Sequence, residues 1–274
     1  MSMVAISQTL GSLGDEIGRS LAQVLGYDFV DREIVLQAAE RFGKGVSAFE
    51  HVTEERPRLW ERFSDVTRGY RTFVEAIIWE IAARDNVIIA GRGAPFVLGA
   101  LCHGVRVRIT GSERVRVTRV ERRLGIDAER ATDIVRQSDH ERAARIRFLY
   151  HVDWNDPLLY DLVINTDSMD ERLSVRLIQA VLESDRHQPG PDSIREVADA
   201  ALAARARADL LSHPLTQPLD LSVACQHGRM SMRGIAAHEE QRRAAEEIVR
   251  TLPGVIEVLN EIVVTSLPRH HVGA

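Results

Sequence analysis

The sequence predicts an α/β domain, a mostly parallel β-sheet with helices on both faces, followed by a small α+β domain. Two observations predict the sheet. Apolar runs of strand length alternate with helical stretches in which apolar residues recur three and four positions apart. A loop that contains Gly11 and Gly14 lies between the first run and the first helix. The polar, proline-containing stretch 186–192 then predicts a linker between residues 1–185 and residues 193–267.

The bulk composition is that of an ordinary soluble protein. Of the 274 residues, 45% are hydrophobic and 27% are charged, and the net charge of -5 argues against a nucleic-acid partner. The cysteines Cys102 and Cys225 lie far apart, which favours a reducing compartment over a disulfide framework. No secretory leader opens the sequence, and no apolar run approaches the ~20 residues that span a bilayer. We therefore expect a cytoplasmic protein without a transmembrane segment.

Apolar spacing and glycine stops predict the first half of the sheet domain. A buried strand at 4–6 leads through the loop into a helix that ends at Gly26, and Asp31 is expected to cap a helix that ends at Phe42. Residues 44–69 are polar and irregular, and we expect a mobile segment over the site there, with one short helix from Ser47. The periodicity then predicts a helix over 70–84 and a strand over 87–90.

The second half continues the alternation. Residues 105–109 alternate in polarity, which predicts a strand with one solvent-facing side. Ser112 is expected to cap an arginine-rich helix. The remaining predicted elements are that helix over 113–124, two helical stretches within 128–150, a strand over 161–165 and a helix over 170–184. Ligands of parallel sheets bind beyond the carboxyl ends of the strands, so the loop at 9–14, the turn at 91–93 and the start of the arginine-rich helix are expected to meet there.

The last third of the chain predicts a unit of its own. Ser193 and Glu196 form a capping-box pattern ahead of a helix that ends near Leu211. The elements expected after it are strands at 219–224 and 229–233, a helix at 238–252 and a strand within 255–264. Residues 268–274 are expected to be a tail.

Residues 9–14 have the layout of a phosphate-binding loop. Glycines let the main chain approach an anion closely, and the first N–H groups and the dipole of the following helix point at it. The standard pattern is G-x-x-x-x-G-K-[ST], but Asp15 and Glu16 follow Gly14 here. Lys44 is the single lysine among the 35 Lys and Arg residues, and no motif places it near a phosphate. Any catalytic cation is therefore expected to be an arginine.

The candidate cations lie mainly in residues 101–150, which hold 12 arginines against 7 acidic residues. Arginine binds phosphate oxygens in pairs, so this block is a candidate anion clamp. The alternative is that most of these arginines lie on solvated helix and strand faces, with two or three directed inward. Arg92 is favoured as functional because it follows an apolar strand at the expected ligand edge.

Other polar and aromatic residues have structural interpretations. Turn and capping roles are favoured over a metal site at His151, Asp153 and Asp156, and no metal-binding residue is predicted. Trp154 and Tyr160 are expected to lie in the core.

Several stretches carry a resemblance to a known family. Residues 3–184 resemble the cytidylate-kinase-like family, a branch of the P-loop nucleoside monophosphate kinases. The supporting stretches are Ile6-Ser7 with Gly11-Ser12-x-Gly14 and Glu16-Ile17, Tyr27-Asp28 with Asp31-Arg32-Glu33-Ile34, residues 88–94, residues 107–114, and Asp153-Trp154-x-Asp156 with residues 160–166. Residues 195–265 resemble a BON domain through Gly228-x-x-x-x-x-Gly234 and Gly254-Val255-x-x-Val258-x-Asn260-x-Ile262.

The resemblance implies a P-loop kinase-like fold that uses ATP and Mg²⁺ and phosphorylates a nucleotide of the CMP or dCMP type. The residues it assigns are Gly11, Ser12 and Gly14 at the donor phosphates, Asp31, Arg32, Arg92 and Asp139 around the acceptor, and Arg116, Arg119, Arg142 and Arg145 in a closing lid. The BON module would bind a lipid, a small molecule or a protein, and a homo-oligomer is conceivable. The alternative is a catalytically impaired nucleotide-binding regulator with the BON domain as its interaction module.

Two departures from the family pattern motivate that alternative. Asp15 stands where kinase-like members carry an arginine, which reverses the charge. A charge about 4 Å away is worth roughly 4 kcal/mol at an effective dielectric constant near 20, so the reversal could cost about three decades in rate or affinity unless a lid arginine compensates. Gly93 stands where related kinases often have an aspartate.

Overall fold

The computed structural model describes residues 2–31, 33–42, 65–99 and 103–265. Contacts divide the chain into two units, Met1–Ile194 and Arg195–Ala274. Arg32, Lys44, Cys102, the expected helix from Ser47, the expected mobile segment up to residue 64, and the tail lie outside the described residues. No helix in the described part of the chain is long and apolar enough to cross a membrane.

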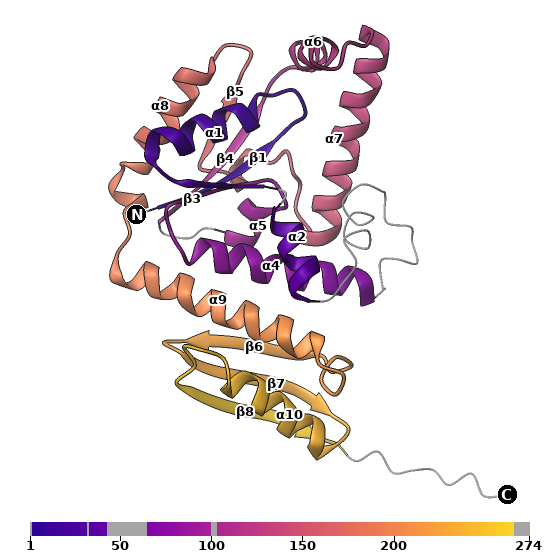
Figure 1. Cartoon of the computed structure of the whole chain (residues 1–274), viewed down its shortest axis with the longest axis vertical. Helices are drawn as coiled ribbons and strands as arrows, with labels where there is room; N and C mark the ends of the chain where they lie inside the picture. Colours follow the sequence, from indigo (N-terminus) through magenta and orange to yellow (C-terminus); the bar gives the residue numbers. More distant parts are fainter. Residues whose placement is uncertain (1, 32, 43–64, 100–102, 266–274) are drawn as a thin grey trace, which may run out of the picture. The chain divides into compact units, whose positions relative to one another are not determined.

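The first unit is built on a five-stranded parallel sheet in the order β2-β3-β1-β4-β5 (Figure 1). The strands are β1 (Met3–Gln8), β2 (Asp28–Val30), β3 (Val87–Ala90), β4 (Gly104–Thr110) and β5 (Leu162–Asn165). In this register Ile6 of β1 lies beside Ala90 of β3 and Val107 of β4, so these strands end at a common edge. The predicted sheet, with helices on both faces, is confirmed.

Helices cover the two faces of the sheet (Figure 1). Helices α1 (Gly14–Leu25) and α8 (Glu171–Leu182) bury Ile17, Leu21 and Ile178 against one face, where Val4 and Ile6 point. Helices α4 (Asp65–Ala82) and α5 (Ala94–Leu98) lie on the other face, and α2 (Glu33–Arg41) packs against α4. Gly26 ends α1 in the left-handed conformation, as its position predicts.

Helices α6 (Glu113–Leu124) and α7 (Ala128–Tyr150) pack on each other through a small apolar cluster that includes Val120 and Val135. The Ser112 side chain caps α6 by accepting from the Val115 N–H, as predicted. The prediction of two helical stretches within 128–150 is wrong, because one continuous helix of 23 residues fills this range. Its sequence contains neither glycine nor proline to interrupt it.

Three local predictions need correction. Helix α4 begins at Asp65, five residues before the predicted start at Tyr70. The side of β4 that carries its arginines is not solvent-facing, because Arg108 is 5% exposed. Helix α9 (Pro191–Ser212) begins at a proline rather than at a capping box, and the Ser193 hydroxyl accepts from the Gly190 N–H.

The second unit continues from α9 and is a small α+β fold. Its sheet has the order β6-β7-β8, with β6 (Leu221–Gln226) antiparallel and β8 (Glu257–Val264) parallel to β7 (Arg229–Ala236). Helix α10 (Glu239–Arg250) connects β7 and β8. Met230, Met232 and Ile262 of the sheet bury themselves against residues of α9 and α10.

Candidate active site

The loop at 9–14 is shaped by main-chain conformations that few residues adopt. Gly11 has a φ of +78°, and a Cβ there would lie 2.8 Å from the carbonyl oxygen of Arg116. Leu13, the N-cap of α1, is also left-handed, with a φ of +63°. A Cβ on Gly14 would overlap the side chain of Gln8. The glycines therefore allow the close approach between this loop, Gln8 and α6.

Ser12 stabilises the loop from within. Its side chain is buried, its hydroxyl donates to the Thr9 carbonyl over 2.7 Å, and its N–H donates to the same oxygen over 3.2 Å. The hydroxyl thus closes a tight turn of the loop.

The first of two clefts lies over this loop and has a volume of about 390 Å³. One wall consists of the loop with Asp15 and Glu16, and the other consists of arginines of α6 and α7: Arg119, Arg122, Arg123 and Arg142. Arg119 also donates to the Gly11 carbonyl over 3.2 Å and to both oxygens of Thr166. Because its guanidinium joins the loop to the end of β5, Arg119 fixes the position of the wall that the loop forms.

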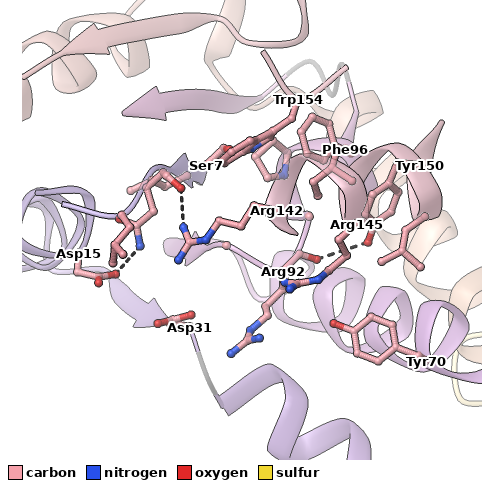
Figure 2. Close-up of a pocket in the computed structure, with 18 of the residues that line it drawn as sticks. Ser7, Asp15, Asp31, Tyr70, Arg92, Phe96, Arg142, Arg145, Tyr150 and Trp154 are labelled. Atoms are coloured by element: carbon pink, nitrogen blue, oxygen red, sulfur yellow. Dashed lines mark hydrogen bonds between the residues drawn. The ribbon is translucent and has the colours of Figure 1, made fainter. Parts of the chain in front are cut away.

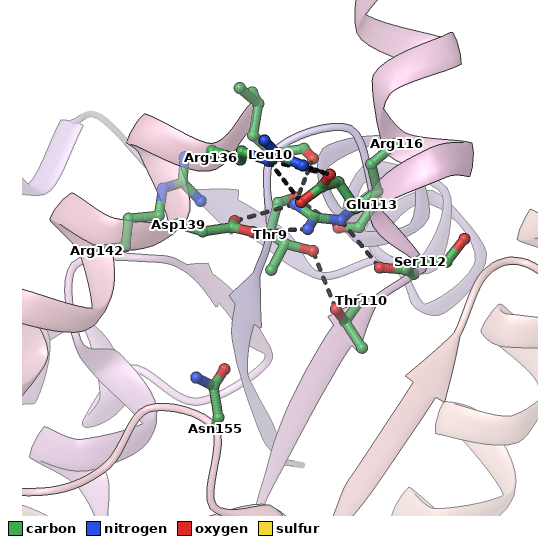
Figure 3. Close-up of polar contacts among 12 residues, drawn as sticks. Thr9, Leu10, Thr110, Ser112, Glu113, Arg116, Arg136, Asp139, Arg142 and Asn155 are labelled. Atoms are coloured by element: carbon green, nitrogen blue, oxygen red, sulfur yellow. Dashed lines mark hydrogen bonds and ion pairs between the residues drawn. The ribbon is translucent and has the colours of Figure 1, made fainter. Parts of the chain in front are cut away.

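Arg116 is buried, and its guanidinium bonds to other groups of the protein instead of lining the cleft (Figure 3). It is 5% exposed and forms a two-pronged ion pair with Asp139 of α7, with distances of 3.0 and 2.6 Å. It also donates to the carbonyl oxygens of Gly111 and Leu10. These four bonds fasten α6, α7 and the loop to one another, so the pair braces the site.

The second cleft, of about 310 Å³, is drawn in Figure 2 and shares Gln8, Asp15 and Arg142 with the first. Four arginines line it, Arg92, Arg123, Arg142 and Arg145, together with Asp15 and Asp31. The rest of the wall is largely aromatic and apolar: Tyr70, Pro95, Phe96, Ile146, Leu149, Tyr150 and Trp154. Four cations in a partly buried hollow with apolar walls favour binding of a small anion.

Two of the arginines of the second cleft, Arg142 and Arg145, are largely buried. Burial lowers the pKa of both Arg142 and Arg145. The buried Nε of Arg145 has no acceptor within hydrogen-bond distance among the described residues. An anion in the cleft would offset the cost of burying these charges.

Arg142 lies where the two clefts meet and lines both. Its Nη1 donates to the carbonyl oxygen of Gln8 over 2.7 Å, and the Gln8 side chain donates to Asp15 over 2.6 Å. The Asp15 carboxylate therefore points back toward β1, into both clefts, and not away along α1. Its negative charge acts directly on Arg142.

The turn after β3 fits its neighbours without room for a side chain at Gly93. Gly93 has a φ of +77°, and a Cβ there would lie 2.4 Å from the ring of Tyr150. Arg92 is also left-handed, with a φ of +54°, and its carbonyl lies 3.4 Å from the Tyr150 hydroxyl. The aspartate that related kinases often carry at this position would collide with Tyr150.

Arg108 is a buried cation that the sequence pattern does not reveal. Its guanidinium lies 3.6 Å from the centre of the Trp154 ring and donates to the Ser7 hydroxyl over 2.9 Å. Trp154 donates to the same hydroxyl over 2.8 Å. Burial lowers the pKa of Arg108 to about 10. Together these contacts build the floor of the second cleft, which Ser7 and Trp154 line.

The structure thus brings together most of the residues assigned from the sequence. The loop with Gly11, Ser12 and Gly14 lines the first cleft, Asp31, Arg92 and Arg145 line the second, and Arg142 lines both. Sequence reasoning missed Arg123, which lines both clefts from the last turn of α6, and Tyr70 and Tyr150, whose pKa values burial raises. The sequence pattern did not identify the two tyrosines as site residues, because at their helical positions they look like ordinary core residues.

The residues considered for a metal site have the predicted turn roles. The carboxylates of Asp153 and Asp156 accept from main-chain N–H groups two residues further on, and His151 ends α7 in the left-handed conformation. Trp154 and Tyr160 are buried, as predicted.

Comparisons with known proteins match both parts of the chain. Residues 3–168 match the model of the cytidylate kinase-like family, and residues 198–266 match that of the BON domain. A cytidylate kinase of Methanothrix thermoacetophila is 27% identical over 184 residues, which cover 66% of this chain and 98% of that protein. One of Methanopyrus kandleri is 28% identical over 190 residues, covering 66% and 93%.

A solved structure supports the fold. The crystal structure of an uncharacterized protein from Eubacterium ventriosum matches with a TM-score of 0.54 and 19% identity, over 67% of this chain and 99% of that one. The loop before α1, the five-stranded parallel sheet and the family match over most of the first unit point to one conclusion. The chain belongs to the cytidylate kinase-like family and carries a C-terminal BON domain.

Proposed function

We propose that the first unit transfers the γ-phosphoryl group of ATP to a pyrimidine nucleoside monophosphate of the CMP or dCMP type. The observation that carries the proposal is the junction of the two clefts at Arg142. The cleft over the glycine-containing loop suits the donor phosphates, and the cleft with Arg92 and Arg145 suits the acceptor phosphate. Transfer between them needs a cation at the point where they meet. The cytidylate kinase relatives support the choice of acceptor.

In this reaction the chain mainly positions the two phosphates and neutralises their negative charge. An oxygen of the acceptor phosphate attacks the γ-phosphorus, a new P–O bond forms, and the bond to the bridging oxygen breaks as ADP leaves. Arg92 and Arg145 hold the acceptor phosphate in this proposal. Arg142 and Arg123 neutralise the charge on the moving group, and the main-chain N–H groups at the start of α1 hold the donor phosphates.

Mg²⁺ would accompany ATP, and the residues present fit it. Magnesium in kinases is held largely by phosphate oxygens and water, together with one or two carboxylates. Asp15 and Glu16 supply carboxylates on the wall of the donor cleft. When bound, the ion would offset the negative charge of the donor phosphates.

The second candidate function is nucleotide binding without turnover, with the BON domain as the interaction module. The position of Asp15 favours it, because a carboxylate lines both clefts where family members carry a cation. The negative charge of Asp15 is partly offset in the structure, because the Gln8 side chain donates a hydrogen bond to Asp15 and Arg142 donates to the Gln8 carbonyl. We favour the kinase because Arg142 supplies the junction with a positive charge.

Two measurements separate these candidates. A coupled assay at high enzyme concentration with CMP, dCMP and UMP should show ADP formation that depends on the acceptor. Calorimetric titration with each nucleotide, with and without Mg²⁺, should show binding that Arg92→Ala removes and that Arg84→Ala, in the exposed turn after α4, preserves. Binding without turnover would select the regulator, and unchanged binding by Arg92→Ala would refute the proposed acceptor site.

A further inference from the structure

The BON domain presents one face of its sheet without a helix over it in the described part of the second unit. Met230 and Met232 point to the face that packs on α9 and α10. The side chains that alternate with them form the opposite face, which we name the outer sheet face. On β7 and β8 it consists of Arg229, Ser231, Arg233 and Ile235 with Glu257, Leu259, Glu261 and Val263. The neighbouring strand β6 adds the uncharged residues Ser222, Ala224 and Gln226 at its margin. Ile235, Leu259 and Val263 are 64%, 55% and 59% exposed.

The parallel register arranges this face in four rows. Arg229 lies beside Glu257, Ser231 beside Leu259, Arg233 beside Glu261, and Ile235 beside Val263. The two charged rows are ion pairs, with distances of 3.3 and 2.6 Å. Along the strands, β7 therefore carries only positive charges on this face and β8 only negative ones.

We propose that the outer sheet face binds the same face of a second copy of the chain. In this arrangement a two-fold axis runs parallel to the strands, midway between the two sheets and above the gap between β7 and β8. Rotation about it preserves the direction of the strands and exchanges the positions of β7 and β8. It therefore places β7 of one copy over β8 of the other, row on row. Each arginine then faces a glutamate of the other copy, and Ile235 faces Val263.

The contact chemistry of this arrangement is complementary in every row. Each charged row becomes a ring of four alternating charges between two sheets, which pack about 10 Å apart in such arrangements. The remaining rows bring Ile235, Leu259 and Val263 out of water, with the small Ser231 opposite Leu259. Exposed ion pairs contribute little by themselves, and the rings contribute more because the second sheet shields them from solvent.

The same pattern disfavours other occupants. An anionic lipid surface or a nucleic acid requires a surface of excess positive charge, whereas this face balances two arginines with two glutamates. A contact made by two strands of each copy is small for a stable interface, so the dimer is expected to be weak, with a dissociation constant on the order of 10 μM.

Charge reversal tests the proposal on the full-length chain. In Arg233→Glu one row holds four negative charges across the interface, and in Glu261→Arg it holds four positive charges. Sedimentation equilibrium should show dimerisation of the unmodified chain and at least about tenfold weaker association of each variant alone. An equimolar mixture of the two variants should recover the dimer, because each glutamate then faces an arginine of the other variant.

The controls distinguish this face from other causes. Arg243→Glu makes the same change of charge on α10, where Arg243 pairs with Glu239, and should leave dimerisation unchanged. Circular dichroism of all variants should match the unmodified chain. A chain that stays monomeric to several hundred micromolar overturns the proposal. A dimer that both variants keep, or that their mixture does not recover, overturns it too, as does a monomer that floats with anionic vesicles.

Discussion

Arg142 of α7 donates to the main-chain oxygen of Gln8 over 2.7 Å, which places its guanidinium at the carboxyl end of β1. In the standard phosphate loop a lysine of the loop itself supplies the cation near this point. Here a helix more than a hundred residues further along the chain supplies one, and Asp15 lies beside it through Gln8. The charge missing from the loop is thus present in the site.

Replacing Arg142 should therefore cost catalysis more than binding. We expect Arg142→Met to lower kcat by about 10²–10³-fold, the range seen when one donor to a developing charge is removed, with a smaller effect on the affinity for ATP. Steady-state kinetics with ATP and CMP would measure both constants. Arg147→Met on the exposed face of the same helix is the matched control. Equal losses for the two variants would contradict the role of Arg142.

Neutralising Asp15 should strengthen nucleotide binding. Asp15→Asn keeps an oxygen that can accept from Gln8 and removes a negative charge from the donor cleft. We expect about tenfold tighter binding of ATP at low salt, with the gain shrinking as ionic strength rises. Calorimetry at two salt concentrations measures this, and Asp133→Asn on the exposed surface of α7 controls for net charge. Weaker binding would instead indicate that the carboxylate holds Mg²⁺.

The sequence predicted the fold better than the roles of the arginines. Parallel strands and helices follow from local periodicity, and the loop and Arg92 were assigned because both follow strands at one sheet edge. The task of Arg116 could not be predicted, since its partners Asp139 and the Leu10 carbonyl come from distant segments. Arg108 has a polar position in an alternating strand, which predicts exposure to solvent. It is buried because Trp154, from a distant segment, packs against its guanidinium.

Gly93 should tolerate no side chain while Tyr150 is present. Gly93→Ala combines a left-handed backbone with a Cβ 2.4 Å from the tyrosine ring. We expect a loss of about 2–4 kcal/mol in the free energy of unfolding, from backbone strain and overpacking together. In a Tyr150→Ala background the same substitution should cost only about 1 kcal/mol. Urea denaturation measures all four proteins of this cycle.

Gly125→Ala isolates the backbone contribution to that prediction. Gly125 is left-handed with a φ of +66°, and a Cβ there would meet nothing within 4 Å. Its substitution should therefore cost about 1 kcal/mol in either background. If Gly93→Ala costs no more than Gly125→Ala, the close contact with Tyr150 does not constrain the turn.

The ion pair between Arg106 and Asp161 should make the stability of the first unit depend on acid. Burial works to raise the pKa of the Asp161 carboxyl, but hydrogen bonds from the Arg106 side chain and N–H outweigh it and hold the pKa below its usual 3.8. A carboxyl with a lowered pKa in the folded state stabilises above its unfolded pKa, and this stabilisation is lost as the pH falls through the folded pKa.

Asp161→Asn should accordingly lower the free energy of unfolding by about 2–3 kcal/mol at neutral pH, because both side chains of the pair are largely buried. The deficit should shrink as the pH falls below 3.8 and through the lowered pKa of the folded carboxyl, where the carboxyl of the unmodified chain also becomes protonated. Urea denaturation across this pH range measures the difference. Glu113→Gln, which breaks the exposed pair with Arg136, should change stability little at any pH. A deficit for Asp161→Asn that stays constant with pH would show that the ionised carboxylate is not what stabilises β4 against β5.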